Sequence, residues 1–164
     1  MLSLVRIDDR LIHGQVATQW VANVSANTIV IIDDETANDE FTTMVCKGMA
    51  PLHVEVFVCT TAEAGEKLRE LDEDSSRRTI VLVKTPGVLL QLMENGVNMK
   101  KIIVGGIGKR ADRKIFYKSI HVSDREIEDL NKIIYVFLTI FLYLLKCPQS
   151  LILSALRAFC FCGK

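Results

Sequence analysis

The sequence has no excess of charge of either sign. Lys and Arg together number 20, Asp and Glu also number 20, and the formal net charge is zero. Because a nucleic-acid-binding protein relies on a basic surface, nothing in the bulk charge favours a nucleic acid as a partner. A chain with this balance can still dock on other proteins through local charged patches.

Paired cysteine motifs and a secretion signal are also missing. The five cysteines form no CxxC pair. A CxC pair, Cys160 and Cys162, has no further clustered ligands, so neither a metal site nor another cofactor is expected. No cleavable signal peptide follows Met1. The odd number of cysteines and the missing leader fit a reducing cytoplasm.

No apolar run is long enough to span a bilayer. Residues 133–145 form an apolar run of 13 residues, whereas a spanning helix needs about 20. A polar interruption at 146–150 then precedes a second apolar piece at 151–162. Acidic residues end at Asp129, so residues 1–129 hold all 20 acids against 16 basic residues, and residues 130–164 hold four basic residues and no acid.

A length of 164 residues suits one compact domain in which short apolar strands alternate with segments of helical spacing. We predict strands at 2–7, 27–32, 54–58, 79–83, 100–104 and 119–122, and helices at about 39–49, 61–71, 88–94 and 124–132. The strand at 27–32 is apolar on both faces, which is typical of a parallel sheet covered by helices. The sequence therefore predicts an α/β fold: an open, mainly parallel sheet with helices on both faces.

The turn between the first strand and the first helix carries the most specific chemistry. A helical pattern begins near Gln15, so His13 is expected on this turn, at the carboxyl end of a strand, where ligands gather in open α/β sheets. A neutral imidazole can attack a phosphorus or carbon electrophile. Arg6 and Arg10 can neutralise an incoming phosphate.

Two further residues of this turn suit an anion. Gly14 lets the backbone approach closely, and the amides of Gly14 and Gln15 at the helix start offer donors. A structural interpretation competes with the catalytic one, because a lone turn histidine more often caps or hydrogen-bonds the backbone. Arg10 could likewise pair simply with Asp8 or Asp9. From these residues alone, both interpretations stay open.

More polar residues are expected at the same edge of the sheet. Asp33 follows the second strand, where it could bind a metal, contact a partner or, as we expect, cap the next helix. Lys84 and Thr85 follow the strand at 79–83 and could touch phosphate. The loop at 104–108 has GGxG spacing, which fails the dinucleotide and P-loop patterns, so Gly106 is expected to let the loop turn tightly beside His13.

The run at 6–16, followed by Gln19 and Trp20, resembles the signature of the IIB component of the mannose/fructose/sorbose family of the bacterial phosphoenolpyruvate-dependent sugar phosphotransferase system. Three later segments fit in the same order: DDETAND at 33–39, KTP at 84–86, and VGGIG at 104–108 followed by Arg113 and Lys114. The similarity is colinear from about Ser3 to Leu130.

The resemblance implies a phosphorelay enzyme, a protein-N(pi)-phosphohistidine–sugar phosphotransferase. His13 matches the histidine that takes a phosphoryl group from a phosphohistidine on a IIA protein or domain. That histidine holds the group on the ring nitrogen nearest the chain and passes it to a sugar bound by the membrane-embedded IIC and IID components. The resemblance also implies a cytoplasmic protein, peripheral to the inner face of the cell membrane through IIC and IID, and it leaves the identity of the sugar open.

Other expectations concern organisation and alternative functions. We expect a IIB-like domain at residues 1–132, with its IIA partner on a separate chain, and a homo-oligomer is a further candidate. Residues 133–164 depart from the family pattern and form no separate domain. They are a buried terminal helix, a segment on the membrane surface, or the product of a frameshift or truncation. The alternative function is a non-catalytic regulatory or binding module of the same fold, and a His/Asp hydrolase is a weaker third.

Overall fold

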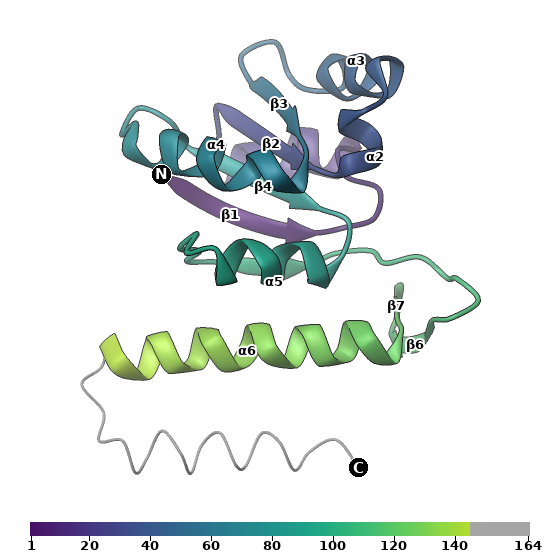
Figure 1. Ribbon diagram of the computed structural model, residues 1–164. Helices are drawn as coiled ribbons and strands as arrows, with labels where there is room; N and C mark the ends of the chain where they lie inside the picture. Colours follow the sequence, from purple (N-terminus) through teal and green to yellow (C-terminus); the bar gives the residue numbers. More distant parts are fainter. Residues whose placement is uncertain (145–164) are drawn as a thin grey trace.

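A five-stranded parallel sheet forms the centre of the protein (Figure 1). The structure, a computed structural model, describes residues 1–144, with the side chains of the last helix described as far as Val136. The strands follow the order β3-β2-β4-β1-β5 across the sheet. Their bounds are β1 Leu2–Ile7, β2 Thr28–Ile32, β3 Glu55–Cys59, β4 Thr79–Val83 and β5 Ile102–Val104. The predicted open, mainly parallel α/β sheet is confirmed.

Helices cover both faces of this sheet. Their bounds are η1 Val16–Trp20, a π-helix continued by α1 Val21–Asn23, then α2 Asp34–Ala37, α3 Glu40–Gly48, α4 Thr61–Glu73, α5 Pro86–Glu94 and α6 Asp124–Leu144. Leu68 of α4 and Leu89 of α5 belong to the core on one face, and Val16 and Cys46 to the core on the other. Alternate residues of a strand face opposite sides of the sheet, and helices cover both sides. The inner strands β2 and β4 are therefore buried at every position.

The strand register brings the carboxyl ends of the sheet to one edge. Ile7 of β1 pairs with Val83 of β4 and Val104 of β5. Ile32 of β2 pairs with the same Val83 and with Cys59 of β3. The residues that directly follow these strands therefore share one border, which we call the carboxyl edge: Asp8, Asp33, Thr60, Lys84 and Gly105.

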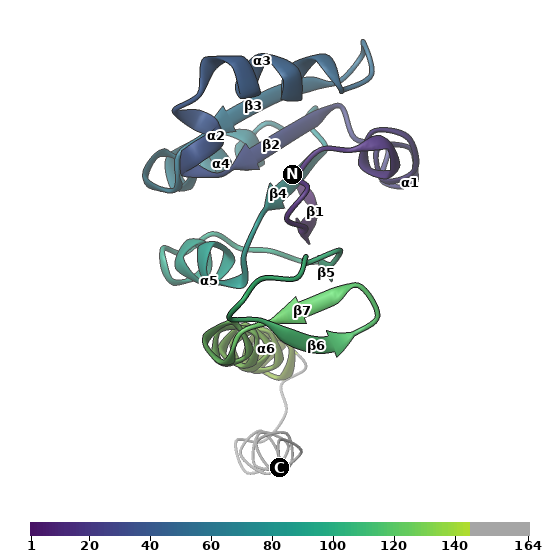
Figure 2. The same ribbon diagram turned by 90° about the vertical axis from the view of Figure 1, so that its right-hand side faces the viewer.

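Two elements differ from the prediction. An antiparallel hairpin of β6 Lys114–Tyr117 and β7 Ile120–Val122 lies beside β5, and its first strand was not predicted (Figure 2). The helix expected at 124–132 continues as α6 to Leu144, although its predicted capping box is confirmed: Glu126 accepts from Ser123 N (2.9 Å) and donates through its own N–H to Ser123 Oγ (3.2 Å). The buried side chain of Ile133 joins the core, so the turn of α6 after residue 132 packs on the domain.

The remaining expectations for the end of the chain lie outside the described residues: the apolar piece at 151–162 and Cys147, Cys160 and Cys162. Cys46 and Cys59 are buried and unbridged. Within residues 1–144, no helix combines the length and the apolar character needed to cross a membrane.

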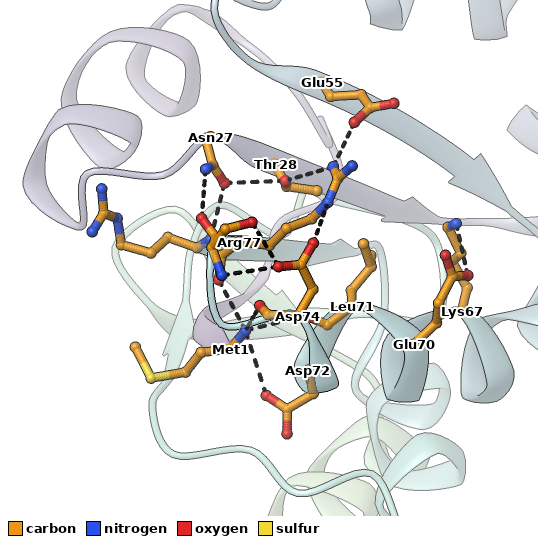
Figure 3. A network of polar contacts seen from close by, with 12 residues as sticks. Met1, Asn27, Thr28, Glu55, Lys67, Glu70, Leu71, Asp72, Asp74 and Arg77 are labelled. Atoms are coloured by element: carbon orange, nitrogen blue, oxygen red, sulfur yellow. Dashed lines mark hydrogen bonds and ion pairs between the residues drawn. The ribbon is translucent and has the colours of Figure 1, made fainter.

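A polar network closes the edge opposite the carboxyl edge (Figure 3). The α-ammonium group of Met1 donates to the carbonyls of Leu71 (3.1 Å) and Arg77 (2.9 Å). The Arg77 guanidinium in turn reaches the carboxylate of Glu55 (2.5 Å) and the hydroxyl of Thr28 (3.3 Å). These contacts tie the amino ends of β1, β2 and β3 to the connection between α4 and β4. The amino ends of these strands are thus fixed by polar contacts.

Candidate functional site

Asp8 is the centre of a charged cluster at the carboxyl edge. Its side chain is fully buried and accepts from Arg6 Nη2 (2.7 Å) and Nε (3.1 Å), from Arg10 Nε and Nη2 (2.9 Å each), and from the backbone amide of Gly106 (3.2 Å). Burial alone would raise the pKa of Asp8, but the hydrogen bonds from Arg10 and Arg6 outweigh it and lower the pKa. Asp8 is therefore a carboxylate anion that fixes two guanidinium groups.

The two arginines differ in access to solvent. The Arg6 side chain is 7% exposed and its guanidinium lies 5.3 Å from the centre of the Trp20 ring, whereas the Arg10 side chain is 53% exposed. Both were predicted to neutralise an incoming phosphate. The structure leaves Arg10 reachable by a ligand and places Arg6 beneath Asp8, where it supports the carboxylate. The open alternative that Arg10 pairs with Asp8 is confirmed.

His13 lies on the predicted turn, with both ring nitrogens close to fixed groups. Nδ1 lies 3.0 Å from the Leu11 carbonyl oxygen, and Nε2 lies 3.8 Å from Asp8 Oδ2. Because a carbonyl only accepts, Nδ1 carries a proton in this geometry. Nε2 is buried without a hydrogen-bond partner, while the side chain as a whole is 16% exposed. The ring thus lies between the Asp8 carboxylate and the Leu11 carbonyl and remains partly accessible.

A strained backbone presents the Leu11 carbonyl to the ring. Leu11 has φ of +53°, in the left-handed region, and its amide donates to the Asp8 carbonyl (3.0 Å). This conformation is costly for a residue with a side chain and persists where the surrounding structure imposes it, often at functional sites. The buried Leu11 side chain is packed into the core, which holds the conformation.

The helix after His13 begins with Gly14 and Gln15. The first hydrogen bond of this helix runs from Ala17 N to the His13 carbonyl (3.0 Å). The backbone amides before Ala17 have no carbonyl partner within the helix, so they can donate to an anion. Both residues are exposed. A Cβ on Gly14 would meet nothing within 4 Å, so packing does not explain a glycine at this position.

The glycine loop after β5 packs directly on the charged cluster. A Cβ on Gly105 would overlap Asp8 Oδ2 and the Arg6 guanidinium, and a Cβ on Gly106 would lie 3.1 Å from Arg10 Nη2. Neither glycine has a positive φ. Close approach of side chains therefore favours glycine here, most strongly at Gly105, and no left-handed backbone conformation requires it. The half-buried Asp9 holds the same loop by accepting from Gly108 N (2.5 Å).

Asp33 and Lys84 form a second cluster further along the carboxyl edge. Asp33 caps α2, as predicted, through Thr36 N (3.0 Å), and it pairs with Lys84 Nζ (2.6 Å). Burial would raise the pKa of Asp33, but the hydrogen bonds from Lys84 and Thr36 outweigh it and lower the pKa. Thr85 is the N-cap residue of α5 and makes no side-chain capping bond. Lys84 is thus occupied by Asp33 rather than aimed at His13.

The sequence analysis gave no site role to three residues of the His13 site: Leu11, Trp20 and Gly105. The neighbouring pair of glycines at 105 and 106 was a usable signal, because adjacent glycines after a strand mark close approach by another group. Trp20 was noted as part of a motif, but its stacking on Arg6 has no sequence pattern. Nothing in the sequence marks Leu11 as left-handed, since leucine rarely adopts that conformation.

Comparison with known proteins gives the site its family context. The family described as "PTS system sorbose subfamily IIB component" matches residues 2–145. The mannose-specific EIIAB component of Escherichia coli strain K12 is 30% identical over 133 residues, which are 81% of this chain and 41% of that protein. The chain thus spans less than half of this relative. The fructose-specific EIIB component of Bacillus subtilis is 29% identical over 125 residues, 76% of each chain.

Solved structures show the same fold. The IIBSor domain of the sorbose permease from Klebsiella pneumoniae superposes with a TM-score of 0.78 at 27% identity, covering 84% of this chain and 83% of that one. The manxB structure from Thermoanaerobacter tengcongensis has a TM-score of 0.69 at 34% identity, covering 80% and 79%. The family match includes every strand of the sheet and every residue of the His13 cluster. The chain therefore belongs to the sorbose subfamily of phosphotransferase-system IIB components.

Proposed function

We propose that this protein is a phosphoryl carrier that takes the group from a phosphohistidine of a IIA protein or domain onto His13 and donates it to a sugar. The sugar would be bound by IIC and IID partners, with the transfer on the cytoplasmic side of the membrane. The observation that carries the proposal is the position of His13 beside the ion pair of Asp8 and the half-exposed Arg10 in a chain of this family. In the first step a P–N bond to the donor breaks as a P–N bond to His13 forms. In the second, that bond breaks as a P–O bond to the sugar forms, and the sugar hydroxyl gives its proton to water.

The surroundings of the ring favour Nδ1 as the attacking atom. A phosphoryl group on Nε2 would meet the buried carboxylate of Asp8, whose oxygen is 3.8 Å away, and two anions repel each other. Attack by Nδ1 requires a change in side-chain torsion that releases this nitrogen from Leu11. Nδ1 then gives its proton to water, and Nε2 takes up a proton from water. The protonated Nε2 can then donate toward Asp8, which makes Asp8 a positioning residue for the ring.

The remaining roles follow from exposure and charge. Arg10 neutralises the transferring phosphoryl group, because its side chain is half exposed and held by Asp8. The amides of Gly14 and Gln15 add backbone donors at the helix start. Arg6 acts only through Asp8. Phosphorus arrives on nitrogen and leaves on oxygen, so the reaction requires no cofactor.

Replacing His13 by alanine should abolish phosphoryl labelling. The purified protein is incubated with radiolabelled phosphoenolpyruvate and the upstream relay proteins, and we expect an acid-labile, base-stable label in the parent but none in His13→Ala. His121→Ala is the matched control, because that half-buried ring bonds a backbone carbonyl outside the cluster, and it should label normally. An unlabelled parent protein would favour a non-catalytic module, and phosphate release without sugar would favour a hydrolase.

Replacing Gly14 by alanine should slow transfer without destabilising the fold. A Cβ at this position enters open space in the protein alone. Alanine at a helical position makes the folded state more stable than glycine does, by about 0.5–1 kcal/mol. We therefore expect an unchanged or higher melting temperature together with at least tenfold slower labelling, since the added methyl group stands where the donor approaches. Gly65→Ala, also in open space but on α4, should label at the parent rate. Equal labelling rates for both variants would show that no ligand approaches Gly14.

A further inference from the structure

The β6–β7 hairpin presents apolar side chains to solvent on both of its faces. Ile115, Phe116 and Tyr117 are 75%, 63% and 56% exposed. The strand pairing shifts between Ile115 and Tyr117, and a strand bends and twists more strongly at such a bulge, so these groups surround the strand instead of forming one flat surface. The hairpin lies outside the five-stranded sheet, below β5 in Figure 2.

Exposed cations flank these apolar residues. Lys114 and Lys118 stand directly on either side, and the preceding loop adds Lys109 and Arg110, with Asp112 as its acid. Lys114 pairs with Asp124 at 3.5 Å, but both side chains are at least four-fifths exposed, so water and salt weaken this pair. The segment at 109–118 is therefore basic and apolar at once.

The base of the hairpin is anchored to the carboxyl edge. Ile107 N donates to the Ser119 carbonyl (3.1 Å), and His121 N donates to the Ile107 carbonyl (2.9 Å). Arg113, just before β6, forms a buried ion pair with Glu126 (2.6 Å). The glycine loop that carries Ile107 is itself bonded to Asp8 and Asp9. The hairpin is thus held in a fixed orientation relative to His13.

We propose that this hairpin docks the protein on an anionic lipid surface. Ile115, Phe116 and Tyr117 enter the headgroup region, and the flanking lysines pair with lipid phosphates. A partner protein with a preformed surface would match apolar groups on a single face, whereas a fluid headgroup layer accepts them on both faces of the strand. The excess of cations complements the negative potential of anionic lipids. Docking in this way holds the carboxyl edge beside the bilayer, and it does not depend on phosphoryl transfer.

Vesicle binding by the full chain tests this proposal. We expect sedimentation with vesicles of phosphatidylcholine containing about 30% phosphatidylglycerol, little with phosphatidylcholine alone, and release by high salt. The double variants Phe116→Ser/Tyr117→Ser and Lys114→Gln/Lys118→Gln should each bind at least tenfold more weakly. The matched control is Phe41→Ser/Met44→Ser on α3, whose side chains are equally exposed at 69% and 64%, and it should bind like the parent.

Three outcomes would overturn the proposal. The first is no binding of the parent chain to anionic vesicles. The second is undiminished binding by both hairpin variants, which would assign any affinity to another segment. The third is membrane binding that needs IIC and IID and is lost in the hairpin variants, which would make the hairpin a protein contact. His13→Ala should bind vesicles like the parent, so that failure of lipid docking and failure of phosphoryl transfer are read separately.

Discussion

Asp8→Asn should lower the free energy of unfolding by about 3–5 kcal/mol. The substitution leaves the Arg6 guanidinium, 7% exposed, without its counter-charge, and it turns an amide group toward donors that need an acceptor. Urea denaturation at neutral pH measures the loss. Asp112→Asn is the matched control, because Asp112 and Arg110 form an exposed pair at 3.5 Å, and it should change the stability by less than about 1 kcal/mol.

The effect of Asp8→Asn should also depend on pH. The pKa of Asp8 is lowered from its ordinary value of 3.8, so the unfolded chain binds the proton more readily than the folded one. The stability that the charge contributes is fully present above pH 3.8 and is lost as the pH falls through the lowered value. The difference between parent and variant should therefore shrink in acid. A difference that stays constant from pH 6 to pH 3 would contradict the assignment of Asp8 as a buried anion.

Arg10→Ala should slow phosphoryl transfer by about 10²–10³ while costing only about 1 kcal/mol of stability. In the proposed mechanism the exposed part of this side chain meets the phosphoryl group on His13, whereas Asp8 keeps Arg6 and the Gly106 amide after the change. Single-turnover transfer from a phosphorylated IIA protein measures the rate.

Two further variants sharpen this experiment. Arg10→Lys keeps the charge but loses the two-pronged contact with Asp8, so it should recover only part of the rate. Arg69→Ala removes an exposed arginine from α4 and should transfer at the parent rate. If Arg10→Ala also transfers at the parent rate, Arg10 is only a structural partner of Asp8.

The central sheet was predictable because its strands obey a simple rule. β2 and β4 are continuous apolar runs, and each is buried at every position between two layers of helices. The capping role of Asp33 and the capping box at Ser123 follow from side-chain chemistry that acts within a few residues of sequence. Local patterns of this kind survive folding unchanged, which is why the sequence predicts them.

The missed features depend on distant contacts. β6 carries neighbouring apolar residues that are all exposed, so it shows no alternation by which a strand is recognised. The burial of Arg6 requires Asp8, Trp20 and Gly105 to meet in space, and no spacing in the sequence encodes that meeting. The same holds for the 3.8 Å approach of His13 Nε2 to Asp8, which bears on the choice of reactive nitrogen.

Nuclear magnetic resonance of the phosphorylated protein, with ¹⁵N in its histidine rings, tests the phosphoryl-carrier mechanism most directly. The mechanism predicts a phosphorus–nitrogen coupling to Nδ1 of His13 and a proton on Nε2, where the Asp8 carboxylate stabilises it. A coupling to Nε2 of His13, or to any nitrogen of His53 or His121, would contradict it.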